Sequence, residues 1–306
     1  MNNNSANQNN SNDRNEIIVE SFRDHLKFLY KKSLELRIEL LKATNKVQFG
    51  HMGSSLSALD ILVTLYYGKF HDRPVMQFDP QKPGWDSQDY FVLSKGHACP
   101  ALYAILADLG FFPKEEMQHL FQMNSLLQGH PMKKIPGIVL SAGSLAHGLS
   151  GALGLAMALK AERQYNRVFC LLGDGELQEG QIWEAAMAAA HYKLDNLVVI
   201  IDDNGLQIEG ATRSVMNVDP IVDKFESFGW KTVPVWGGHN FEELLSALER
   251  AIEVQRRPAV VVAHTIKGKG VSFAENKSFY HGVPLSDEEM AVAIPALEQE
   301  LALLDL

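Results

Sequence analysis

The sequence predicts an α/β fold in which helices cover both faces of a doubly wound, mostly parallel sheet. Short apolar runs, such as residues 197–201 and 259–263, alternate with longer segments whose apolar side chains recur at helical spacing. Such runs are typical of buried strands, and helices between them imply parallel βαβ units with right-handed crossovers. Polar or glycine-rich turns follow several runs. In open α/β sheets, ligands bind at this edge, where the strands end.

Two helices are expected before the first strand of the sheet. Residues 17–47 carry apolar side chains at helical spacing, and Gly50 follows as a residue that ends helices. A second helix is expected over residues 56–67, because Ser57 and Asp60 are spaced as a capping box.

Strands and helices then alternate along the chain. Asp219 and Asn240 are predicted to cap the helices that follow them, and Pro220 suits a first helical position. The expected strands are residues 90–93, 167–172, 197–201, 231–235 and 259–264. The expected helices are residues 100–109, 148–163, 181–192, 220–228 and 241–255, with a last helix from residue 286 to about 304.

Composition excludes several classes of protein. The longest apolar runs are far shorter than the ~20 residues of a membrane-spanning helix. A net charge of −9 argues against nucleic acid or an anionic membrane as the main partner. Residues 1–16 lack the apolar stretch of a signal peptide, so we expect a disordered Asn-rich tail followed by one domain over residues 17–306. Two cysteines, of which Cys170 lies in an apolar run, fit a reducing cytoplasm.

The motif with the clearest chemical content is Gly173-Asp174-Gly175, which follows an apolar strand and precedes a helix. Glycines let the backbone approach an anion such as a diphosphate, and a helix N-terminus attracts it. Asp174 would repel that anion unless a cation lay between them. Asp203-Asn204 at the end of the next strand supplies an amide oxygen, and neither Cys nor a close His pair is available there, so Mg²⁺ or Ca²⁺ is expected rather than zinc.

Several motifs together resemble the transketolase family. Gly173-Asp174-Gly175 and Asp203-Asn204 look like its thiamine diphosphate motif, and the whole of residues 173–210 resembles that family nearly position by position. Further similar stretches follow in the family's order from about residue 28 to 290: Phe49-Gly50-His51, residues 91–97, Gly129-His130-Pro131, Gly143-Ser144-Leu145 with Gly148, and residues 281–285.

The resemblance implies roles for particular residues. Mg²⁺, or Ca²⁺ as its substitute, would be held by Asp174, Asn204 and the backbone carbonyl of Leu206. Thiamine diphosphate would be contacted by residues of several turns: His97, Gly143, Ser144, Leu145, Gly173, Asp174, Gly175, Asn204 and His281. The catalytic histidines lining the substrate channel would be His51, His97, His130 and His281. Glu179 and Glu184 match family glutamates near the dimer interface, although an ordinary helix surface explains them equally well.

Some positions depart from the family's pattern. Its Gly-Pro-Leu-Gly-Gln-Gly loop has Ser144 in place of Pro, Ala146 in place of Gly and His147 in place of Gln. Residues 265–285 look closer to the related deoxyxylulose phosphate synthases, which normally carry the whole cofactor site on one longer chain.

The resemblance also implies a partner. In transketolases, a second α/β domain holds the cofactor's pyrimidine ring and its activating glutamate, and no second set of strand and helix patterns follows residue 264 here. The expectation is therefore the N-terminal subunit of a split cytoplasmic transketolase. It would act with a C-terminal subunit in an α₂β₂ heterotetramer, transferring a two-carbon ketol unit from a ketose (phosphate) donor to an aldose acceptor.

Other functions remain alternatives. One is another thiamine diphosphate-dependent transferase, such as a deoxyxylulose phosphate synthase-like or sulfosugar-directed enzyme. Another is a non-catalytic cofactor-binding subunit, which would not need all four matching histidines. An NAD-binding protein is disfavoured, because no Gly-x-Gly-x-x-Gly opens an early helix. A serine hydrolase is disfavoured because there is no nucleophile elbow.

Overall fold

The computed structural model describes residues 6–304, with side chains described from residue 21 onward. Its central sheet has five strands in the order β3, β4, β5, β9, β8, and every neighbouring pair runs parallel. The strands are β3 (Tyr90–Leu93), β4 (Val168–Gly173), β5 (Leu197–Asp203), β8 (Lys231–Val235) and β9 (Ala259–His264). These are the segments predicted as strands, so the predicted fold class is confirmed.

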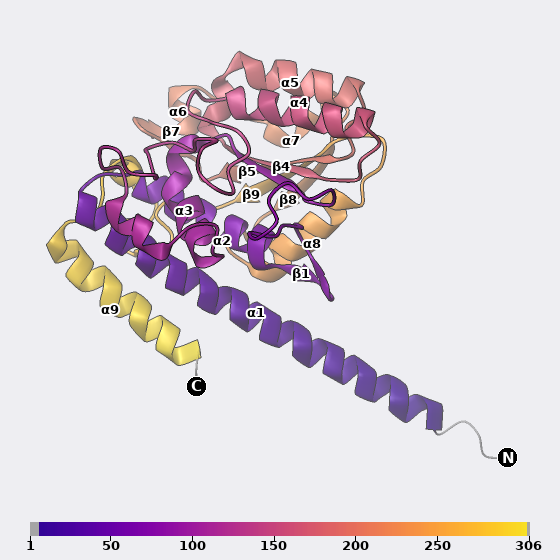
Figure 1. Ribbon diagram of the computed structural model, residues 1–306, viewed down its shortest axis with the longest axis horizontal. Coiled ribbons are helices and arrows are strands. Elements are labelled where there is room, and N and C mark those ends of the chain that lie inside the picture. Colours follow the sequence, from indigo (N-terminus) through magenta and orange to yellow (C-terminus); the bar gives the residue numbers. More distant parts are fainter. Residues whose placement is uncertain (1–5, 305–306) are drawn as a thin grey trace.

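Helices cover both faces of this sheet (Figure 1). Within β4, Phe169 and Leu171 enter one apolar core, whereas Cys170 and Leu172 enter the other. Because both faces are buried, the strands appear in the sequence as uninterrupted apolar runs. One face carries α1 (Ala6–Val47), α2 (Met52–Tyr67), α3 (Cys99–Asp108) and α8 (Phe241–Ile252), with α9 (Asp287–Leu304) packed against α1. The other carries α4 (His147–Ala161), α5 (Gly180–His191) and α7 (Ile221–Ser227).

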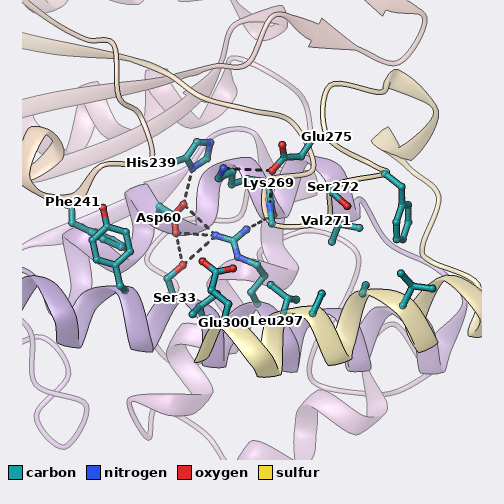
Figure 2. Close-up of a pocket in the computed structure, with 18 residues that line it drawn as sticks. Ser33, Asp60, His239, Phe241, Lys269, Val271, Ser272, Glu275, Leu297 and Glu300 are labelled. Carbon is teal, nitrogen blue, oxygen red and sulfur yellow. Dashed lines mark hydrogen bonds and ion pairs between the residues drawn. The ribbon is translucent and has the colours of Figure 1, made fainter. Parts of the chain in front are cut away.

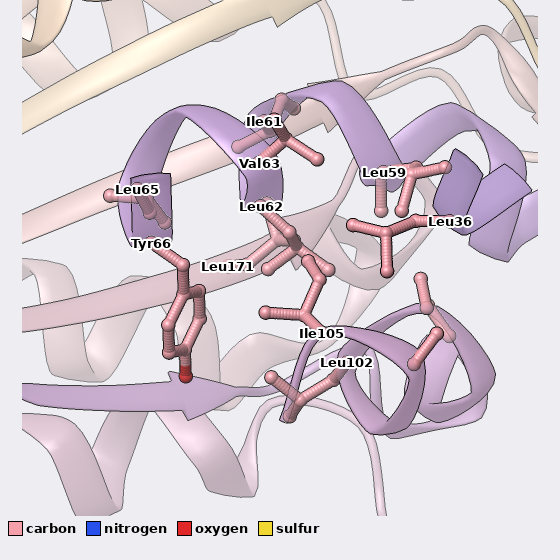
Figure 3. Packing of buried hydrophobic residues seen from close by; sticks show 14 of the residues in the cluster. Leu36, Leu59, Ile61, Leu62, Val63, Leu65, Tyr66, Leu102, Ile105 and Leu171 are labelled. Atoms are coloured by element: carbon pink, nitrogen blue, oxygen red, sulfur yellow. The ribbon is translucent and has the colours of Figure 1, made fainter. Parts of the chain in front are cut away.

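Helix α2 connects the core to the edge where the strands end. Its residues from Met52 to Tyr66 are all buried, as expected for a helix surrounded by other elements. In Figure 3, Leu62 of α2 lies among apolar side chains that come from α1, α3 and β4: Leu36, Leu102, Ile105 and Leu171. This packing anchors α2 in the core, and the first turn of α2 reaches the candidate site through Ser54.

The first helix differs from its predicted bounds at one end. It ends at Val47 as predicted but begins at Ala6, so residues 6–16 lie in the helix where a disordered tail was expected. Residues 1–5 of that tail lie outside the described residues. No glycine or proline interrupts the segment from Ala6 to Val47. After the helix, Gln48 has a φ of 48° and the predicted Gly50 has a φ of 133°, so both have positive φ values.

The predicted capping box of the second helix was wrong. Helix α2 begins four residues earlier, at Met52. Ser57 instead donates a hydrogen bond to Asp202 over 2.6 Å. Asp60 forms an ion pair with Arg37 over 3.0 Å. Both side chains are thus bound to distant parts of the chain, which a local capping pattern does not reveal.

Of the two predicted helix caps, one is confirmed. The side chain of Asn240 accepts from the backbone N–H groups of Glu242 and Glu243 at the start of α8. At α7 the cap residue is Pro220 rather than Asp219, and the carboxylate of Asp219 forms an ion pair with Arg213 over 2.5 Å.

Both edge strands of the sheet are unfavourable for further pairing. β3 has four residues. β8 carries the exposed Pro234. The N–H of Lys231 donates to the carbonyl of Pro258, directly before β9. Backbone N–H directions alternate along a strand, so the backbone nitrogen of residue 234 faces outward. Because proline has no N–H, no donor is available there for another strand.

Small elements absent from the prediction shape two loops. The hairpin strands β1 (Lys69–Phe70) and β2 (Arg73–Pro74) follow α2. Strands β6 (Leu206–Gln207) and β7 (Gly210–Ala211) form a hairpin after β5, which leads into α6 (Thr212–Val215).

Cys99 and Cys170 are both buried free thiols. Within residues 6–304, none of the helices combines the length and hydropathy needed to cross a membrane.

Candidate functional site

The predicted turns meet at one edge of the sheet. Gly173 at the end of β4 pairs in register with Asp202 of β5. Asp203 at the end of β5 pairs with His264 of β9. The turn after β3 joins them through Lys95, whose ammonium group forms an ion pair with Asp202. The carboxyl ends of four neighbouring strands therefore place their polar side chains together, as the sequence predicts.

Asp174 lies in the turn after β4 and is almost fully buried. Thr212 at the start of α6 donates a hydrogen bond to its Oδ2 over 2.7 Å. Burial, and then the charges of Asp203 and Asp202, raise the pKa of Asp174 to about 6. The negative charge of this buried carboxylate is not fully compensated by its neighbours. A bound cation would compensate it.

Two further oxygen donors lie in the turn after β5. The Oδ1 atom of Asn204 accepts from the N–H of Leu206 over 3.2 Å. The N–H of Thr212 donates to the carbonyl of Gly205 over 3.0 Å, which ties this turn to the partner of Asp174. Within the described residues, no group of three or more His, Cys, Asp or Glu side chains could hold a metal ion. A metal here would depend on one carboxylate, one amide and one carbonyl, which are hard oxygen donors that suit Mg²⁺ or Ca²⁺.

Two buried lysines, which sequence reasoning missed, support these turns. Lys267, in the turn after β9, donates to the carbonyl of Leu206 over 3.0 Å and to the hydroxyl of Ser54 over 3.3 Å. Burial and the nearby Lys95 lower the pKa of Lys267 to about 8. Buried lysines are rare unless paired, and here the ion pair of Asp202 is with Lys95. The site is therefore prepared for an anion. The sequence signal was a lysine within three residues of the end of two of the strands.

Three of the predicted histidines form a cluster. The ring centroids of His51 and His97 are 5.0 Å apart, those of His97 and His281 are 5.2 Å apart, and those of His51 and His281 are 5.5 Å apart. Burial and nearby cations lower the pKa of His51, lower that of His97 well below its ordinary value, and lower that of His281 to about 3. All three imidazoles are thus neutral at pH 7.

One atom of this cluster is unsatisfied. The Nδ1 atom of His281 is buried without a hydrogen-bond partner among the described residues. Buried polar atoms are rarely left unpaired, so this atom marks a place where a bound group would complete the site. The residues present therefore fit an anionic cofactor with a polar group reaching His281.

His130 and the loop at residues 143–145 lie beside the cluster rather than in it. His130 is exposed. A Cβ atom built on Gly96 would lie 3.2 Å from its Cδ2, and one built on Gly143 would lie 3.9 Å from its Cγ. Gly143 and Ser144 are exposed and Leu145 is half-buried. This part of the predicted site forms an open rim on the described chain.

Glu176 binds three of the turns to one another. Its Oε1 accepts from the Ser94 hydroxyl over 2.5 Å and from the N–H of Ala146 over 2.7 Å. Its Oε2 accepts from the N–H of Gly173 over 3.1 Å. This buried carboxylate is therefore the link between the turn after β3, the turn after β4 and the start of α4. Glu176 directly follows the Gly173-Asp174-Gly175 motif in the sequence, but the sequence alone indicates none of these contacts.

Ala146 adopts a backbone conformation that favours glycine, with a φ of 70°. Replacing it with glycine (A146G) is expected to raise the free energy of unfolding by about 0.5–1 kcal/mol, because the left-handed region costs alanine energy that glycine avoids. Thermal or urea unfolding measures this. The matched control is Ala152→Gly inside α4, which is expected to destabilise the protein by about 1 kcal/mol. Equal destabilisation by both changes would contradict the strain at Ala146.

Gly175 and two glutamates complete the set of predicted residues. Gly175 opens a short 3₁₀ helix, where an added Cβ atom would lie 3.4 Å from Gln207. Glu179 and Glu184 are both exposed on the described chain, around the start of α5.

Several known proteins are similar to this chain over most of its length. The family model described as "Transketolase, thiamine diphosphate binding domain" matches residues 31–300. The chain is 41% identical over 261 residues to the 6-deoxy-6-sulfo-D-fructose transketolase subunit SqwG of Clostridium sp. (strain MSTE9), covering 85% of this chain and 92% of that protein. It is 39% identical over 281 residues to an apulose-4-phosphate transketolase subunit of Phocaeicola vulgatus, covering 88% of this chain and 98% of that protein.

Longer proteins match over part of their length. Transketolase of Mus musculus is 41% identical over 251 residues, which are 82% of this chain and 39% of that protein. The crystal structure of transketolase from Campylobacter jejuni superposes with a TM-score of 0.78 at 28% identity, covering 90% of this chain. The chain spans about half of that solved transketolase, at 48% of its length.

Proposed function

Because the chain belongs to the transketolase family, we propose that it is the N-terminal subunit of a two-chain transketolase. It would transfer a two-carbon ketol unit from a ketose to an aldose with thiamine diphosphate and Mg²⁺. The observation that carries this proposal is the arrangement at one sheet edge. Oxygen donors from Asp174, Asn204 and Leu206 lie beside the buried Lys267, which contacts the Leu206 carbonyl, and the turns meet a cluster of neutral histidines.

The metal and the diphosphate would be held by the turns after β4 and β5. Asp174, Asn204 and the Leu206 carbonyl would bind Mg²⁺, while Lys267 and the N–H of Gly175 would face the diphosphate. His97, His281 and the residues of the open rim, Gly143, Ser144 and Leu145, would contact the rest of the cofactor. When bound, thiamine diphosphate supplies the nucleophilic carbon and electron sink that ketol transfer needs.

The histidines would handle the sugar. Because burial keeps the pKa of His51, His97 and His281 below neutral, each ring can accept one hydrogen bond and donate another at pH 7. Neutral imidazoles at this position can orient sugar hydroxyls and take up or release a proton at them. His130 at the exposed rim would complete the channel.

The relatives of matching length support a partner chain. Both are named as transketolase subunits, and this chain covers 92% and 98% of them. The partner would be a C-terminal transketolase subunit that holds the pyrimidine ring and the activating glutamate, in an α₂β₂ complex. We place the complex in the cytoplasm, which the two free thiols support.

Co-purification from the native cell, followed by a ketol-transfer assay, tests the proposed function. The expected result is one co-purifying chain of similar size and activity that requires thiamine diphosphate and Mg²⁺. A complex that binds the cofactor without transferring any ketol unit would favour a non-catalytic subunit instead.

The donor is proposed to be an anionic ketose. The relatives are named for a sulfosugar and a sugar phosphate. Product analysis with fructose 6-phosphate, 6-deoxy-6-sulfofructose and apulose 4-phosphate would distinguish the donors. It would also separate a sugar phosphate transketolase of carbohydrate metabolism from a sulfosugar-directed enzyme or a deoxyxylulose phosphate synthase-like one.

A further inference from the structure

A buried ionic network lies outside the candidate site. It borders a cavity of about 350 Å³ between α1, α9 and residues 269–275 (Figure 2). Its centre is the carboxylate of Asp60 on α2, which is buried. Arg37 on α1 forms an ion pair with it over 3.0 Å, and Ser33 donates a hydrogen bond to it. His239, in the loop before α8, contacts its Oδ2 through Nδ1 over 2.6 Å.

The two ring nitrogens of His239 have different partners, which determines its tautomer. Its Nε2 lies 2.8 Å from the backbone nitrogen of Ile266. A backbone N–H can only donate, so Nε2 is the acceptor and Nδ1 carries the proton that His239 donates to Asp60. Arg37 meanwhile donates to the backbone carbonyl of Lys269. Asp60, Arg37 and His239, here called the Asp60 clamp, therefore hold the chain on both sides of Lys267.

The segment that the clamp holds carries a cation of the site. Lys267 lies between Ile266 and Lys269 and reaches the Leu206 carbonyl and Ser54 with its ammonium group. The segment is also fixed nearer the sheet, because Thr265 donates to the carbonyl of Asp203 and Gly268 to that of Gly53. The N–H of Asn276 also donates to the carbonyl of Lys267 over 2.9 Å. The clamp adds side-chain attachments on both sides of Lys267, and its Asp60 lies on the same helix α2 whose first turn contains Ser54.

We propose that the Asp60 clamp is a positioning device for Lys267, with His239 as its adjustable member. Through the hydrogen bond from Ile266 to His239, the clamp sets where the Lys267 ammonium group stands relative to Ser54 and the Leu206 carbonyl. None of the clamp residues touches the site itself. The proposal deepens the proposed function and rests on it, since Lys267 faces the diphosphate only if the chain binds one.

Two substitutions of His239 separate the two contacts. In His239→Asn, the side-chain amide occupies the place of Nδ1, so it can donate to Asp60 but cannot reach Ile266. In His239→Gln, the longer side chain brings its carbonyl to the place of Nε2, where it can accept from Ile266. The two variants are matched in polarity, and each keeps a different one of the two contacts. His239→Asn keeps the bond to Asp60, whereas His239→Gln keeps the bond from Ile266, through which the proposal says that Lys267 is positioned.

Two measurements on the full chain read out the effect. Hydrogen exchange of the Ile266 amide, without cofactor, is expected to accelerate about tenfold in His239→Asn, the size of one lost hydrogen bond. The dissociation constant for thiamine diphosphate with Mg²⁺, measured by calorimetry on the complex with the co-purifying chain, is expected to rise about tenfold. His239→Gln should restore both values to within about twofold of the native protein.

Other results would overturn the proposal. An unchanged dissociation constant in His239→Asn would mean that the clamp does not position Lys267, even if exchange accelerates. Equal losses in both variants would mean that the bond to Ile266 is not the cause. If the native complex itself binds no thiamine diphosphate, the proposed function fails. The exchange measurement then still shows whether the clamp holds residue 266, and equal exchange in all three proteins would refute it.

Discussion

The isolated chain is expected to catalyse no ketol transfer above background, whereas the reconstituted complex should turn over at rates of ordinary enzymes, about 1–10³ s⁻¹. The physical reason is the state of the carboxylates around the site. Asp202 pairs with Lys95, and Asp203 with His264. Asp174 accepts from Thr212, and Glu176 accepts from the turns that it links.

None of these four carboxylates is free to activate a cofactor ring. Activation is therefore expected to need a glutamate from the partner, at the rim where Ser144 is exposed. The measurement is a coupled assay of aldose and ketose exchange with the chain alone, the partner alone and the two mixed. Robust turnover by the chain alone would refute the shared active site. The partner mixed with an Asp174→Asn chain serves as the inactive control.

Asp174→Asn is the second change with a large expected effect, a loss of at least about 10³-fold in activity of the complex. An amide removes the negative charge that a divalent cation needs and keeps an oxygen for Thr212, which now donates to Asp174 over 2.7 Å. Binding of thiamine diphosphate should lose its dependence on Mg²⁺, as calorimetry with and without EDTA would show. Unchanged affinity would remove Asp174 from the metal site.

The same substitution is expected to stabilise the metal-free chain. Burial raises the pKa of Asp174 to about 6, above its ordinary value of 3.8. A raised carboxyl pKa means that the native state binds a proton more tightly than the unfolded state, so stability falls as pH rises from about 4 to 6. Asparagine avoids this loss. Its advantage should be about 1–3 kcal/mol at pH 8 and should shrink at pH 5.

Asp203→Asn is the matched control for the effect on cofactor binding. Asp203 lies at the same sheet edge, but His264 contacts its carboxylate over 2.8 Å. We expect this variant to retain cofactor binding that depends on Mg²⁺. Loss of cofactor binding in both variants would point to the general charge of the edge rather than to a ligand at position 174.

Strands and turns could be predicted because their signals are local. A strand such as β5 is buried on both faces, so its apolar run is continuous, and the turn that follows it must lie at the common edge of a parallel sheet. The start of α2 could not be predicted in the same way. Ser57 and Asp60 have the spacing of a capping box, but their partners Asp202 and Arg37 are brought to them by the tertiary structure.

The buried lysines were missed for a related reason. A lysine in a polar turn is normally solvated, and nothing near Lys267 in the sequence indicates that Ser54, more than two hundred residues away, will contact it. Similarly, nothing in the sequence near His239 distinguishes it from an ordinary histidine. Its two ring nitrogens are bound by Asp60 on one side and by the segment carrying Lys267 on the other. Only the fold shows that these two contacts act on one segment.

The two edge strands affect how such a subunit avoids aggregation before it binds a partner. A chain that waits with part of its surface uncovered risks joining other copies edge to edge into fibres. Four-residue β3 offers little length for such pairing, and Pro234 withholds a donor on the outer side of β8. Both edges of the sheet therefore disfavour pairing with a strand of another copy. Association is then expected through contacts between side chains rather than through backbone hydrogen bonds.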